Sequence, residues 1–257
     1  MIAAALGWLG AAAIGVSLGL FGSGGSILTV PVLIYLFGQD EKVAIAGSLA
    51  IVGSIALAGA IPHLRARLID WRNVWLFGVP GMGGTYLGAW TAQFVPGIAQ
   101  LAMFAVVMLI AAYMMLRPPN VENPGSGRAV WKISLDGLLV GILTGLVGVG
   151  GGFLIIPALV LLGGMTMHRA VATSLVIIAL KSFSGFYKYL DVLAAQNLSL
   201  DWDVIGLVTA LGITGSIAGN QLGKRVPQAA LRRGFSYFLI VMGIYILARS
   251  LPAALGF

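Results

Sequence analysis

An apolar, glycine-rich segment occurs twice in this chain. Residues 15–33 read GVSLGLFGSGGSILTVPVL, and residues 141–159 read GILTGLVGVGGGFLIIPAL. The offset of 126 residues holds without a gap as far as Leu49 and Leu175, and 15 of the 35 aligned positions are identical. The similarity resumes at an offset of 131, where Asp70-Trp71 matches Asp201-Trp202. The sequence is therefore an internal duplication, and its fold must be built from two similar halves.

The composition predicts a membrane protein. Hydrophobic residues make up 59% of the chain and charged residues only 9%, whereas soluble chains carry about 25% charged residues. Residues 43–64 and 74–116 contain no charge, and runs of this length can cross a hydrocarbon core of about 30 Å as helix. A transmembrane β-barrel would need alternating segments of about 10 residues. We predict an all-α polytopic membrane protein that lies in a lipid bilayer.

Several classes of function are disfavoured by what the sequence lacks. It has no cysteine, which excludes disulfides and thiolate metal sites, and we expect no metal or cofactor. No hydrolase, zinc or nucleotide-binding motif occurs, so we expect no enzyme. The net charge of +7 is read as basic cytoplasmic loops rather than as a nucleic-acid site. The N-terminus lacks the basic region of a signal peptide and is expected to form the first membrane segment.

The chain divides into two membrane repeats, at residues 1–117 and 133–257, joined by a polar linker at 118–132. The linker region is rich in proline, glycine and serine, as connectors are. Each repeat is predicted to hold one broken apolar segment, either re-entrant or a pair of short crossings, and three full spans. The broken segments are 2–37 and 133–164; the spans are 43–64, 74–94 and 99–116, then 170–190, 204–222 and 234–250.

The charges of the loops predict that the two repeats are inverted. In the first half the basic loop carries Arg65, Arg67 and Arg72, and the loop around Pro96 has no charge. The second half shows the opposite order, with an acidic loop at 191–203 followed by a basic one at 224–233. Because basic loops tend to face the cytoplasm, equivalent loops would lie on opposite sides. The N-terminus is then expected on the periplasmic side and the linker inside.

Two glycine clusters supply the main candidates for a binding site. A continuous helix over 2–37 would measure about 54 Å, too long for one crossing, so a break is expected at the glycines. A helix that restarts after a break presents free N–H groups and its positive dipole end to an anion. The alternative is close helix packing. The candidates are Gly22, Ser23, Gly24, Gly25 and Ser26, and Gly148, Gly150, Gly151 and Gly152.

Small hydroxyl side chains follow both clusters at equivalent positions. Ser48 in the first half matches Ser174 in the second, and Thr173 precedes Ser174. Such groups can donate a hydrogen bond to a substrate oxygen, or they can bond back to their own helix. Their pairing across the duplication favours the binding interpretation.

Lys181 lies deep within the predicted span 170–190. A charge at this depth costs at least about 2.5–3.5 kcal/mol, and no carboxylate occurs mid-span in the sequence. An anionic substrate is the simplest partner; the alternative is a lysine at a helix kink that reaches water from inside. Weaker candidates are Asn220, Gln221, His63 and His168, of which the histidines are interpreted as interfacial because they lie beside span ends.

Taken together, these motifs resemble the TauE/SafE family. The resemblance rests on the two G-x-G-G-[SG] segments followed by L-x-x-P-x-L, the A-T-S-L stretch at 172–175 and the repeated Asp-Trp, and it covers essentially the whole chain. It implies a bacterial inner-membrane permease for sulfite or organosulfonates such as sulfoacetate. It also implies secondary transport, with protons as the candidate coupling ion.

Two functions remain open at this stage. The leading hypothesis is a secondary transporter that moves a small anion by alternating access, because paired glycine-interrupted segments in two repeats point to a transporter's substrate site. The alternative is an anion channel, since the same helix ends can line a pore. A homodimer is also left open.

Overall fold

The computed structural model describes residues 2–22, 24–116, 130–147, 152–162, 164–223 and 225–254, and these contain only helices and connecting turns. Most are α-helices, and two short segments are π-helical. The first half holds α1 (Ile2–Phe21), α2 (Gly24–Tyr35), α3 (Glu41–Arg65), α4 (Trp71–Asn73), η1 (Val74–Gly78), α5 (Val79–Ala92) and α6 (Gly97–Leu116). The second holds α7 (Val130–Val147), α8 (Gly152–Pro157), η2 (Ala158–Leu162), α9 (Met167–Ala195), α10 (Trp202–Gly223) and α11 (Gln228–Ala254).

The predicted all-helical membrane architecture is confirmed. Within the described ranges, six helices are long and apolar enough to cross a membrane: α3, α6, α7, α9, α10 and part of α11. Many large apolar side chains, among them Trp75, Phe94 and Val241, are exposed on the outside of the bundle. A face of this kind suits lipid, which is as apolar as the side chains themselves.

One predicted span contains a π-helical segment. The span 74–94 corresponds to η1 followed directly by α5, and helical structure is continuous from Trp71 to Ala92. Pro80 lies at the start of α5, and proline removes a donor from the helical hydrogen-bond ladder. The second π-helical segment, η2, directly follows Pro157. A proline therefore lies close to each π-helical segment, after η1 in the first half and before η2 in the second.

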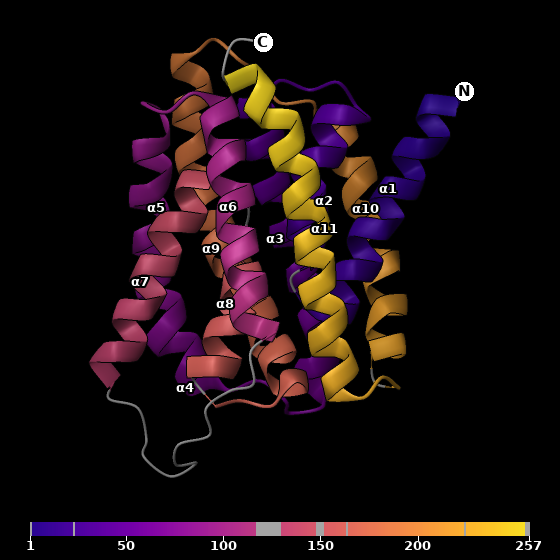
Figure 1. Cartoon of the computed structure of the whole chain (residues 1–257), viewed down its shortest axis with the longest axis vertical. Helices are drawn as coiled ribbons and strands as arrows, with labels where there is room; N and C mark the ends of the chain where they lie inside the picture. Colours follow the sequence, from indigo (N-terminus) through magenta and orange to yellow (C-terminus); the bar gives the residue numbers. More distant parts are fainter. Residues whose placement is uncertain are drawn as a thin grey trace.

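Both broken segments consist of separate helices. The first is α1 and α2, which meet at Gly22 and Gly24. The second is α7 and α8, whose junction at residues 148–151 lies outside the described residues. Figure 1 shows α1 running down from the N-terminus at the top, whereas α7 starts near the bottom of the view.

Helices of one half pack mainly against helices of the other. The closest pairs are α5 with α7 and α1 with α10, followed by α6 with α11 and α3 with α9. α3 and α9 are the most buried of the spanning helices. Each pair joins an element of one repeat to an element of the other, so the two halves form one body rather than two domains (Figure 1).

Glycine allows the closest of these contacts. A Cβ on Gly84 of α5 would overlap the carbonyl oxygen of Leu138 in α7, and a Cβ on Gly215 of α10 would lie 2.6 Å from the carbonyl oxygen of Ala12 in α1. Gly81 and Gly88 also approach α7 closely. The packing interpretation of these glycine-spaced helices is confirmed.

Candidate functional site

The first glycine break meets the start of α9 inside the bundle. Gly22 has a φ of +70° and ends α1, where its N–H donates to the Leu18 carbonyl at 2.7 Å. A Cβ here would lie 2.9 Å from Cα of Val171 and 3.0 Å from Oγ of Ser174. Both the left-handed backbone and the close approach require glycine. Ser174 Oγ donates to the Gly22 carbonyl at 3.3 Å and to the Val171 carbonyl at 2.9 Å.

The helix that follows the break begins in buried surroundings. α2 starts at Gly24, and Gly25 and Ser26 in its first turn are buried. A Cβ on Gly25 would overlap the Ile14 carbonyl oxygen, so α1 and α2 pack backbone to backbone. Thr29 Oγ1 donates to the Gly25 carbonyl at 2.7 Å. The N-terminal end of α2 therefore lies inside the protein, where backbone N–H groups are strong anion donors.

Of the remaining predicted glycine-cluster residues, the structure describes Gly152. Ser23, Gly148, Gly150 and Gly151 lie outside the described residues. Gly152 is the first residue of α8 and is buried.

The other small hydroxyls lie at helix contacts. Thr173 Oγ1 accepts a hydrogen bond from the backbone N–H of Asp70 at 3.0 Å, which ties the start of α9 to the start of α4. Ser48 Oγ donates to the Ile45 carbonyl of its own helix at 2.8 Å. The structure thus brings Ser174 to the glycine break, whereas the Thr173 hydroxyl is hydrogen-bonded to the backbone of Asp70.

Lys181 lies two turns beyond Ser174 on the same face of α9, about 10 Å along the axis. It is fully buried. Its Nζ lies 5.1 Å from the centre of the Phe77 ring, and its Cε faces Gly81 of α5. Within the described part of the chain, Nζ has no hydrogen-bond partner. The structure confirms the depth of this lysine and places it against α5 rather than at the glycine break.

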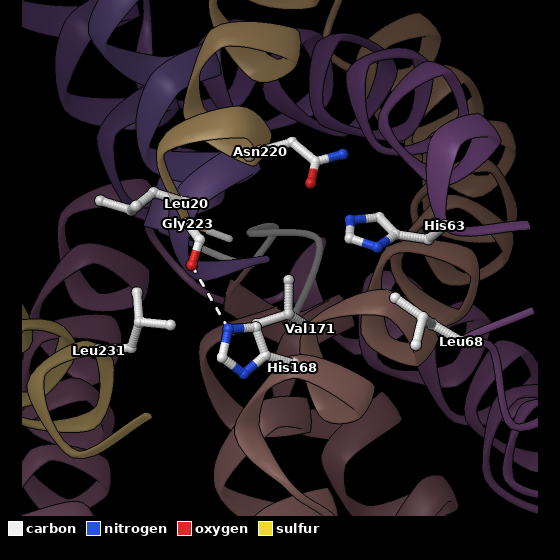
Figure 2. A pocket seen from close by; sticks show the side chains of 9 residues that line it. Leu20, His63, Leu68, His168, Val171, Asn220, Gly223 and Leu231 are labelled. Carbon is white, nitrogen blue, oxygen red and sulfur yellow. Dashed lines mark hydrogen bonds between the residues drawn. The ribbon is translucent and has the colours of Figure 1, made fainter. Parts of the chain in front are cut away.

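A small, partly open cavity adjoins the first break (Figure 2). The lining residues come from α1, α3, α9, α10, α11 and the loop after α3: Gly19, Leu20, His63, Leu68, His168, Val171, Asn220, Gly223 and Leu231. His168 Nε2 lies 3.4 Å from the Gly223 carbonyl. The sequence made Asn220, His63 and His168 weak candidates, the histidines because they lie beside span ends. Their convergence from distant segments leaves no local signal in the sequence.

The described residues contain no group of three or more His, Cys, Asp or Glu side chains that could hold a metal ion. What the site offers instead is backbone N–H groups, small hydroxyls and imidazoles, with the buried ammonium of Lys181 farther along α9. This donor set suits an anion.

Comparison with known proteins identifies the family of this chain. The family model described as "Sulfite exporter TauE/SafE" matches residues 7–246. Two similar proteins from Xylella fastidiosa, both called "Probable membrane transporter protein", are 31% identical (strain 9a5c) and 33% identical (strain Temecula1). In each case the match covers 92% of both chains. The Bacillus subtilis "Probable membrane transporter protein YunE" is 30% identical over 87% of this chain and 86% of its own.

No solved structure matches the chain significantly. The family and its relatives are membrane transporters, so the protein is a multi-pass membrane transporter and not an enzyme. The chain belongs to the TauE/SafE family of sulfite exporters.

Proposed function

We propose that this protein is a secondary transporter that moves a small anion, sulfite or an organosulfonate such as sulfoacetate, across the bacterial inner membrane. The observation that carries the proposal is the contact between Ser174 and Gly22 at the first helix break. There a hydroxyl from one repeat lies beside the interrupted backbone of the other. Interrupted backbone at membrane depth is tolerated only within protein or beside a water-filled cavity, and here a cavity adjoins it.

The anion would be held mainly by the protein backbone. The N-terminal turn of α2, with Gly24, Gly25 and Ser26, offers N–H groups and the positive end of a helix dipole. Ser174 and Thr173 approach from α9. By the duplication, Gly148, Gly150, Gly151 and Gly152 with Ser48 would supply the matching half of the site. Neutral donors of this kind release an anion more readily than a fixed ion pair would.

Lys181 is proposed to offset the charge of the anion during passage. It is fully buried at mid-span, where an uncompensated charge is costly. Its position two turns beyond Ser174 lies farther along the same face of α9. We propose that the anion, with a proton as the candidate coupling ion, approaches this ammonium when the site changes its access from one side to the other.

Inverted repeats, spanning 1–117 and 133–257 around the linker 118–132, would provide that alternation. α1 and α10 run parallel, since Gly15 approaches Gly212 and Gly19 approaches Ser216. α5 and α7 also run parallel, because Gly137, Gly141 and Gly145 approach Phe77, Gly81 and Thr85 in that order. The start of α9 contacts both Asp70, which precedes α4, η1 and α5, and Gly223, which ends α10. The helical run that ends in α5 therefore begins at the end of the bundle where α10 finishes. These directions support opposite orientations for the equivalent helices α1 and α7.

Cysteine labelling tests the inversion in this naturally cysteine-free chain. Arg67→Cys and Arg225→Cys occupy non-equivalent loops and should both react from the cytoplasmic side with a membrane-impermeant thiol reagent. Ser199→Cys, in the acidic loop, should react from the periplasmic side. All three side chains are exposed. If Arg67→Cys and Arg225→Cys react from opposite sides, the inverted arrangement is wrong.

Anion binding by purified protein tests the substrate class. We expect sulfite or sulfoacetate to raise the melting temperature, because a ligand at 100 times its Kd stabilises the native state by about 2.7 kcal/mol. Taurine, which has no net charge, and short carboxylates serve as comparisons. Stabilisation by carboxylates alone would contradict the proposed substrate. Ohmic single-channel currents carried by the same anions would favour the alternative, an anion channel.

A further inference from the structure

The two ends of the bundle can be compared residue by residue because the chain is duplicated. At an offset of 126, Lys42 corresponds to His168, and at an offset of 131, Ala92, Ala89 and Gln100 correspond to Gly223, Asn220 and Leu231. His63 and Tyr189 occupy the same position counted from the first residues of α3 and α9. Two equivalent clusters therefore exist, one at each end.

The cluster around Lys42 is called the sealed cluster below, because its polar side chains are buried and hydrogen-bonded to one another. Lys42 Nζ donates to the carbonyls of Ala92 and Val95, both at 2.7 Å, and to Gln100 Oε1 at 2.6 Å. Gln100 Nε2 donates in turn to the Leu146 carbonyl and to Tyr189 Oη, the latter at 3.1 Å. Lys42, Gln100 and Tyr189 are all buried. This network of hydrogen bonds joins α3, α6, α7 and α9.

The equivalent cluster at the basic end is the cavity next to Gly22. His168, the equivalent of Lys42, forms a hydrogen bond of 3.4 Å to the carbonyl of Gly223. This bond is the counterpart of the one from Lys42 to Ala92. Leu231 takes the place of Gln100, and its apolar side chain cannot form the hydrogen bonds that Gln100 makes. Figure 2 shows Asn220 and His63 pointing toward one another across the cavity, with Val171 beneath them. Val171 also contacts Gly22, so the cavity reaches the helix break.

The surroundings of this cavity favour an anion. Among the described residues that line it, none is aspartate or glutamate. Four exposed arginines lie within two residues of lining positions: Arg65 beside His63, Arg169 beside His168, Arg225 beside Gly223 and Arg233 beside Leu231. Clefts ringed by charge of one sign concentrate the opposite ion and raise its rate of arrival.

We infer that His63, His168 and Asn220 form an entry site for the transported oxyanion at the basic end, and that the structure is open there and closed at the Lys42 end. The imidazole and amide N–H groups would donate to sulfonate or sulfite oxygens before the anion moves on to Gly22 and Ser174. This inference rests on the proposed function for the identity of the ligand, whereas the one-sided opening rests on the two clusters alone.

Thiol labelling in nanodiscs tests the inference. Val171→Cys lines the cavity, and Ile45→Cys is its repeat equivalent in the sealed cluster. A small methanethiosulfonate should label Val171→Cys at least about tenfold faster, as expected for one open and one closed cluster. Sulfoacetate, which does not consume thiol reagents, should slow this labelling. Adding Asn220→Leu or His168→Leu should weaken the protection about tenfold or more, the usual effect of losing a hydrogen bond to a charged group.

The matched control is Gln221→Leu, the exposed neighbour of Asn220, which should leave the protection intact. Equal labelling of Val171→Cys and Ile45→Cys would overturn the one-sided opening. If sulfoacetate stabilises the protein but Asn220→Leu and His168→Leu do not change its protection, the entry site is wrong and the proposed function stands. If sulfoacetate and sulfite neither bind nor protect, both proposals fail.

Discussion

Gly84→Ala should strongly destabilise the protein, whereas Gly83→Ala should leave it folded. A Cβ on Gly84 would overlap the carbonyl oxygen of Leu138 across the α5 and α7 contact, while a Cβ on Gly83 meets nothing within 4 Å. Overpacking of this kind costs about 1–3 kcal/mol and occasionally more. Because the obstacle is backbone, we expect the upper end of that range. Gly83→Ala should stay within about 1 kcal/mol of the parent.

The duplication supplies a second, independent pair for the same measurement. Gly215→Ala would bring a Cβ to 2.6 Å from the Ala12 carbonyl oxygen between α10 and α1, and Gly206→Ala faces open space. The measurement is the melting temperature of the four purified variants in detergent, which should be lower for Gly84→Ala and Gly215→Ala than for Gly83→Ala and Gly206→Ala. Similar melting temperatures within both pairs would mean that these helices do not pack as closely as the structure has them.

Replacing Lys181 should abolish transport without unfolding the protein. Lys181→Met keeps most of the side-chain volume between Phe77 and Gly81 and removes the charge. Losing a desolvated charge partner typically costs about 2–5 kcal/mol in affinity, which is a loss of more than tenfold in transport at low substrate. The melting temperature should hold or rise, because a buried charge without a partner destabilises the folded protein.

Two further variants separate the charge of Lys181 from its shape. Lys181→Ala should lose transport equally but also lose stability, because it leaves a cavity. Lys188→Met removes a lysine from the same helix whose Nζ is paired with Asp191 at 2.9 Å, and it should transport normally. Unchanged affinity in Lys181→Met would make the lysine a structural residue and leave the anion site to the helix breaks and hydroxyls.

Much of the fold could be predicted from the sequence because its signals are local. Apolar runs marked the six full spans, whose predicted ends agree with the observed helices to within about six residues. The glycine cluster marked the first break, where Gly22 adopts a positive φ. The π-helical segment at residues 74–78 was not predicted.

The site was only partly predictable because its contacts join distant segments. Ser174 and Gly22 are 152 positions apart, and Gln100 and Tyr189 are 89 apart. Nothing in the local pattern pairs such residues. His63 and His168 look interfacial when each is taken alone, and only the folded arrangement turns them toward one cavity. The duplication indicates that these positions matter, because their equivalents Lys42 and Tyr189 belong to a hydrogen-bonded network.

Solute counterflow tests most directly whether this chain carries a small sulfur oxyanion by alternating access. Proteoliposomes preloaded with unlabelled sulfite are diluted into a trace of radiolabelled sulfite with no other gradient imposed. A carrier whose single site faces one side at a time must exchange the two pools, so we predict transient accumulation of label well above that in empty liposomes. Uptake that needs no preload and never exceeds equilibrium would show a channel, and no uptake of sulfite or sulfoacetate would contradict the proposed function.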